Sequence, residues 1–122
     1  MMQHQQIIKT LETKVATDEE TLVTETNKKE STIKSNEELN SKLNQLNEEF
    51  ASIENDSNLT ADEKSKKSAK IKKKISSTQS KINLNSKKIE ISTKKIETLE
   101  KRIESSKKEL EEKKKKEEEK KK

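Results

Sequence analysis

The chain has 122 residues, of which 43% are charged and 24% hydrophobic, and its formal net charge is +5. A globular domain is normally close to half apolar, so this composition excludes a rounded core and leaves either disorder or a narrow helical seam. The sequence has no Cys, which excludes disulfides and thiolate metal sites, and no Gly or Pro, the residues that most often interrupt long helices.

Residues 1–55 are predicted to form a first coiled-coil helix, because their apolar side chains recur with a seven-residue period. A single heptad frame, with core positions a and d, holds from residue 8 to residue 53. Polar residues such as Asp18 and Asn36 occupy some core positions, and an Asn there can fix the register at some cost in stability. The apolar core members are Ile8, Leu11, Val15, Leu22, Leu39, Leu43, Leu46, Phe50 and Ile53.

Residues 56–60 are predicted to form a turn, since Asp, Ser and Asn side chains compete with helical hydrogen bonds. Thr60 and Glu63 have the spacing of a capping box, in which Thr60 is the N-cap and Glu63 the third helical residue. A new helix is therefore expected to begin at residue 61.

Residues 61–110 are predicted to form a second coiled-coil helix, again from a heptad of apolar residues. Residues 111–122 contain no apolar side chain and are predicted to be a charged tail, either a solvated extension or a segment that a partner orders. The core members of the second helix are Ile71, Ile75, Ile82, Ile89, Ile96, Leu99, Ile103 and Leu110.

The two heptad frames fit together if the chain folds back near residue 57, because each a position then faces a d position, as an antiparallel coiled coil requires. Charge favours the same pairing. Residues 1–55 have 6 basic and 11 acidic side chains, whereas residues 56–122 have 23 basic and 13 acidic. The layers expected from this frame pair Leu11 with Ile103, Asn36 with Thr78, and Lys29 with Asn85.

The predicted fold class is therefore all-α, a long antiparallel two-helix coiled-coil hairpin with a charged C-terminal extension. Two alternatives stay open at this point: a parallel dimer of one continuous helix, and partial disorder of the free chain. Because few layers have two apolar members, the hairpin is expected to associate with itself or with a larger assembly.

A stripe of basic residues follows position g of the second helix, and it has two interpretations. It is either a solvated face with ion pairs along the helix, or a surface for a polyanion such as nucleic-acid phosphates, an acidic protein or anionic lipid. The absence of any aromatic residue besides Phe50 argues against binding of single strands by stacking. The stripe consists of Lys67, Lys74, Lys81, Lys88, Lys95 and Arg102.

No catalytic constellation, phosphate-binding loop or metal-ligand cluster is recognisable, and His4 stands alone. We therefore expect a protein that is not an enzyme and has no cofactor, metal or small-molecule substrate. The first hypothesis is a structural or scaffolding coiled-coil protein that binds partner proteins in a larger assembly, for example a cytoskeletal one. The alternative is binding of nucleic acid or another polyanion through the lysine-rich face of the second helix.

The N-terminal residues lack an apolar run typical of a signal peptide, and no stretch approaches the length of a membrane span. A soluble intracellular protein is expected, cytoplasmic rather than nuclear.

Overall fold

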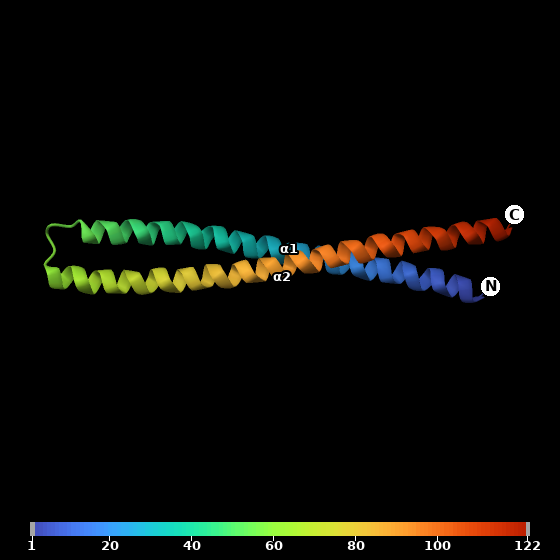
Figure 1. Cartoon of the computed structure of the whole chain (residues 1–122), viewed down its shortest axis with the longest axis horizontal. Helices are drawn as coiled ribbons and strands as arrows, with labels where there is room; N and C mark the ends of the chain where they lie inside the picture. Colours follow the sequence, from blue (N-terminus) through green and yellow to red (C-terminus); the bar gives the residue numbers. More distant parts are fainter. Residues whose placement is uncertain (1, 122) are drawn as a thin grey trace. The chain divides into compact units, whose positions relative to one another are not determined.

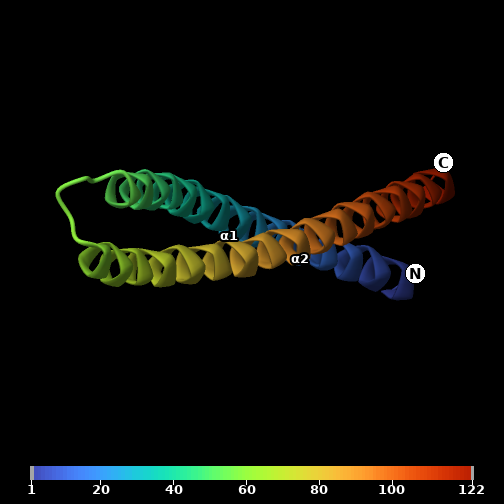
Figure 2. The ribbon, with the colours of Figure 1, turned by 60° about the vertical axis from the view of Figure 1, so that its left-hand side comes forward.

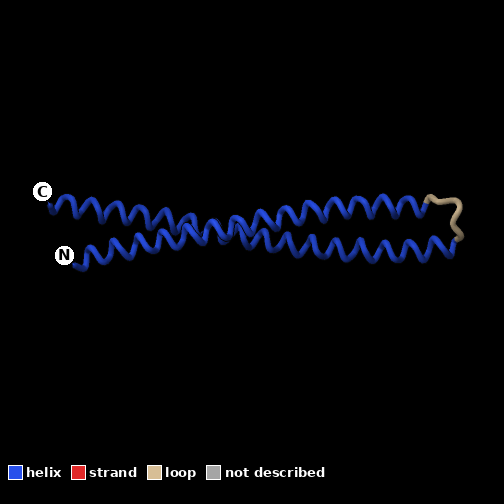
Figure 3. The backbone as a smooth tube through the Cα atoms, turned by 180° about the vertical axis from the view of Figure 1, so that it is seen from behind, coloured by secondary structure: helices blue, strands red, loops and turns tan. Residues whose placement is uncertain are grey.

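The computed structural model describes the backbone of residues 2–121 and the side chains of residues 3–119. Helix α1 spans Met2–Glu54 and helix α2 spans Ala61–Lys121. Residues 55–60 connect the two helices, and the described part of the chain has no strand (Figure 3). The predicted all-α two-helix hairpin is confirmed. Helix α2 continues past residue 110, so most of the predicted tail is a direct extension of the same helix.

The chain divides into two compact units. The loop unit is Glu30–Glu90 and includes the connection, and the terminal unit combines Met1–Lys29 with Ile91–Lys122. In Figures 1 and 2 the loop unit has its part of α1 in teal to green and its part of α2 mainly in yellow, lying side by side.

The helices are antiparallel within the loop unit, as two interhelical hydrogen bonds show. Close to the connection, the Ser68 hydroxyl donates to Glu54 Oε1 at 2.7 Å. Further from it, Asn85 Nδ2 donates to the Ser35 hydroxyl at 3.4 Å. Partners on α1 therefore have lower residue numbers as those on α2 have higher ones.

The same direction holds within the terminal unit. The Ser92 hydroxyl donates to Glu25 Oε1 at 2.9 Å. Near the chain ends, His4 Nε2 lies 2.9 Å from the Lys113 carbonyl oxygen, to which it donates.

The connection is held by its own polar residues. The Asn58 N–H donates to Asp56 Oδ1 at 2.9 Å, and the Leu59 N–H points to the Asp56 carbonyl at 3.5 Å. Thr60 caps α2, because its hydroxyl accepts the Glu63 N–H at 3.1 Å and donates to Glu63 Oε1 at 3.0 Å. The capping pair of the sequence therefore lies at the start of α2.

Replacing Thr60 by Ala should lower the free energy of unfolding by about 1 kcal/mol, because the first turn of α2 loses its side-chain cap. Urea unfolding followed by circular dichroism would measure this change. Thr98→Ala is the matched control: the Thr98 hydroxyl donates to the Lys94 carbonyl within the helix, and Ala has the higher helix propensity. Equal losses in both variants would show that the cap does not stabilise α2.

The seam between the helices follows the heptad frame. All seventeen predicted apolar core members are buried or half-buried, as are the polar residues at a and d between Ile8 and Ile53. Asp18, Ser68, Thr78, Ser92 and Ser106 are buried polar members. The buried hydrophobic residues are Ile8, Leu11, Val15, Leu46, Ile71, Ile82, Leu99 and Ile103.

The register in the loop unit differs from the predicted layers. Asn36 Nδ2 points to the Ile82 carbonyl at 3.5 Å and to the Ser86 hydroxyl at 3.4 Å, rather than to the expected Thr78. Asn85 Nδ2 likewise donates to the hydroxyl of Ser35. If one helix is shifted along the other by seven residues, every core residue still lies in the seam. The apolar pattern therefore defines the buried faces but not the axial offset, which depends on the connection.

Candidate functional site

The predicted basic stripe is exposed at all six positions. Four of its members, from Lys67 to Lys88, belong to the loop unit, and the other two belong to the terminal unit. The five lysines of the stripe form no ion pair within the described part of the chain. Their charge is therefore available to an external partner.

An open groove of about 370 Å³ lies beside the stripe at the loop end of the loop unit. Lys67, Lys70 and Lys74 line it together with the carboxylates of Glu49 and Asp56. Apolar side chains from both helices and the connection complete the lining, namely Ile53, Leu59 and Ile71. The groove therefore presents both signs of charge over a small apolar surface.

Two further lysines of this region are engaged within the loop unit. The Lys64 ammonium donates to the Glu54 carbonyl at 3.1 Å, next to the end of α1. Lys72 Nζ lies 5.6 Å from the centroid of the half-buried Phe50 ring, which is a cation–π distance. Lys64 and Lys72 therefore both interact with α1, whereas the lysines of the stripe in this unit make no ion pair.

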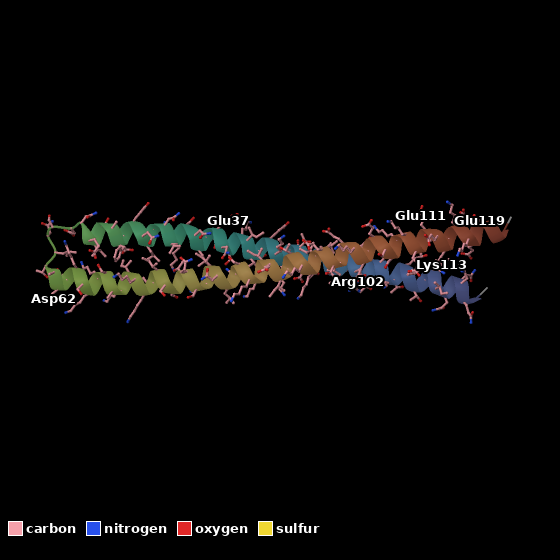
Figure 4. All side chains as sticks on the ribbon, in the orientation of Figure 1. Glu37, Asp62, Arg102, Glu111, Lys113 and Glu119 are labelled. Atoms are coloured by element: carbon pink, nitrogen blue, oxygen red, sulfur yellow. The ribbon has the colours of Figure 1, made fainter. Side chains whose placement is uncertain are left out.

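Arg102 differs from the lysines of the stripe because it makes an interhelical ion pair. Its Nη2 lies 3.0 Å from Asp18 Oδ1, while Asp18 Oδ2 is buried without a hydrogen-bond partner. Asp18 is only 5% exposed, whereas the Arg102 side chain is 53% exposed. The guanidinium of Arg102, labelled in Figure 4, therefore compensates a buried carboxylate, whereas the lysines of the stripe have no such ion pair.

Ion pairs also flank the seam of the terminal unit, on the side opposite the stripe. Lys107 Nζ lies 3.0 Å from Glu19 Oε1, and Lys114 Nζ lies 3.8 Å from Glu12 Oε1. All four residues occupy position e, where opposite charges select partner and orientation in coiled coils. These pairs could have been predicted from the opposite charges at position e of the two heptad frames.

Beyond Leu110, Lys113 and Lys114 contact α1. Lys113 is half-buried and its carbonyl accepts the bond from His4, for which the sequence suggested no role. Figure 4 shows Lys113 on the side of α2 that faces α1 and Glu111 on the opposite side. Past the last apolar residue, Leu110, α2 therefore still has one side toward α1 and one side away from it.

Among the described side chains, no group of three or more His, Asp or Glu lies close enough to hold a metal ion. Within the same residues, neither helix has an apolar stretch that would span a membrane.

Comparisons with known proteins give the chain no family. No protein-family model matches it, and no curated protein or solved structure matches it.

Proposed function

We propose that the chain is a non-catalytic structural protein that holds partner proteins, or further copies of itself, in a larger assembly. The observation that carries this proposal is the incomplete burial of the seam. Even the best-covered core side chains, such as Leu46 and Ile71, retain some exposure, and none of the large described ones is fully buried.

A seam of this kind contributes little stability per residue. A fully buried Leu or Ile stabilises a protein by about 1.5–3 kcal/mol, and partial burial contributes less. Several seam positions are polar, and large apolar side chains such as Val23, Ile33 and Leu84 are exposed on the outer faces. Association with another protein surface would cover part of this apolar area and stabilise the helices.

The thermal unfolding midpoint is expected to rise with protein concentration, or on addition of a partner-enriched fraction of the native extract, because binding to the folded state stabilises it. Circular dichroism between about 5 and about 500 µM protein would measure the shift. A midpoint that stays constant under both conditions would contradict the proposal.

A pull-down from the native extract with washes at low and high salt would identify the type of contact. Partners bound through apolar contacts should remain at high salt, whereas a polyanion should be released. Ile103→Asn, which places an amide in the buried seam, is the control variant. Partners that recognise the folded helix pair should not bind to it.

A second candidate function, binding of a polyanion, is supported by a separate observation. Lys67, Lys74, Lys81 and Lys88 are exposed in one unit and have no acidic partner there. A row of lysines without ion pairs on a helix attracts polyanions through an electrostatic field that salt screens. Affinity for an anionic polymer that falls steeply between low and moderate salt would support this function.

A further inference from the structure

The part of α2 in the loop unit carries an unusual concentration of free positive charge. Between Lys64 and Ile89 the sequence has ten lysines and no acidic residue. Eight of these lysines are exposed, and their side chains make no hydrogen bond or ion pair with the described residues. They form what we call the lysine face: Lys66, Lys67, Lys70, Lys73, Lys74, Lys81, Lys87 and Lys88.

The basic residues of the terminal unit are in a different situation. Arg102, Lys107 and Lys114 each pair with a carboxylate of α1, and Lys108 pairs with Glu104 along the helix at 3.6 Å. Between residues 97 and 112, acidic residues alternate with the basic ones. In this unit, part of the positive charge therefore pairs the helices or balances neighbouring carboxylates.

We propose that the lysine face of the loop unit binds the phosphate backbone of double-stranded nucleic acid without reading its sequence. This inference rests on the second candidate function and specifies its ligand and its location. Successive lysines at position g are about 10.5 Å apart along the helix. A duplex carries one negative charge per about 1.7 Å of its axis. Each lysine can therefore contact a phosphate wherever the helix lies along the duplex.

Other polyanions fit this surface less well. A helix that lies on a lipid surface buries an apolar face in the membrane, but the apolar side of α2, with Ile71 and Ile82, is buried against α1. Between residues 64 and 89, Leu84 is the one large apolar side chain that the structure shows exposed. Single strands bind by stacking of bases on aromatic rings, and Phe50 is half-buried with Lys72 over its ring.

The test compares two variants with the same change in net charge. Lys67, Lys70, Lys74 and Lys81 become Gln in the loop-unit variant, whereas Lys95, Lys101, Lys115 and Lys116 become Gln in the terminal-unit variant. All eight positions are exposed, and Gln has nearly the helix propensity of Lys, so both variants should fold. Circular dichroism verifies their helix content.

Binding is measured by fluorescence anisotropy with DNA duplexes of about 25 base pairs in two unrelated sequences. The wild-type chain should bind both sequences equally, and its affinity should fall about 100-fold between about 50 and about 150 mM salt if about five phosphates are neutralised. The loop-unit variant should lose most of this affinity and reduce the salt slope by about 3 to 4. The terminal-unit variant should lose less than about five-fold.

Separate outcomes overturn the inference and the candidate function. Equal losses in the two variants would reject the lysine face as the site, although polyanion binding would stand. Preference of the wild-type chain for phosphatidylserine vesicles or for poly-glutamate over the duplex would reject nucleic acid as the ligand. No binding to any of the three probes at low salt would reject both the inference and the second candidate function.

Discussion

Replacing Ile103 by Asn is expected to abolish most of the helical structure, whereas replacing Ile91 by Asn should leave it intact. The two isoleucines belong to the same helix and the same unit, but Ile103 is 8% exposed and Ile91 is 55% exposed. The buried substitution loses up to about 1.5–3 kcal/mol of apolar burial and leaves a polar amide in the seam, at a further cost of about 1–3 kcal/mol.

A combined loss of about 3 kcal/mol is large for a pair of helices with so little apolar surface, since compact domains are stable by only about 5–15 kcal/mol. Far-UV circular dichroism would show the loss of helix, and urea titration would give the change in the free energy of unfolding. Similar stability of the two variants, within about 0.5 kcal/mol, would mean that the seam does not stabilise the fold.

A second large effect is expected at the pair of Asp18 and Arg102. Replacing Arg102 by Met removes the single hydrogen-bond donor that the structure shows for the buried carboxylate of Asp18. Breaking a buried ion pair costs about 3–5 kcal/mol. Because the guanidinium is half-exposed and screened by solvent, a loss of about 2 kcal/mol is expected here.

Asp18→Leu should have the opposite effect, because it removes the unpartnered Oδ2 and adds an apolar residue to the seam. The double variant, Asp18→Leu with Arg102→Met, should be at least as stable as the wild type. This non-additivity distinguishes the ion pair from general packing by Arg102, and a double-mutant cycle in urea measures it. If Arg102→Met destabilises the Asp18→Leu background as much as the wild type, the role of the pair is disproved.

Much of the fold could be predicted because the heptad pattern depends only on residues that are close in the sequence. A period of seven residues specifies which face of a helix is apolar, and every predicted core member from Ile8 to Leu110 is covered at least in part. The polar cluster between Glu54 and Ala61, with its capping residues, placed the reversal. These features depend on neighbours in the sequence and require no knowledge of distant contacts.

The axial offset and the ion pairs could not be derived in the same way. Sliding one helix by a heptad preserves the buried faces, so Asn36 could be expected opposite Thr78 although it contacts Ile82 and Ser86. The role of Arg102 depends on the register within the terminal unit, since its partner Asp18 belongs to the other helix. Periodicity therefore identified the basic stripe, but only the three-dimensional register separates its free lysines from its paired arginine.

The connection between the helices has a practical consequence. None of its residues adopts a positive φ, so the reversal uses backbone conformations that any L-amino acid can adopt. Asn58 bonds to Asp56, and Thr60 bonds to Glu63. Both interactions join residues that are close in the sequence. An epitope tag or a fluorescent peptide inserted there should be accommodated without unfolding the helices, which makes the connection a suitable position for a reporter in living cells.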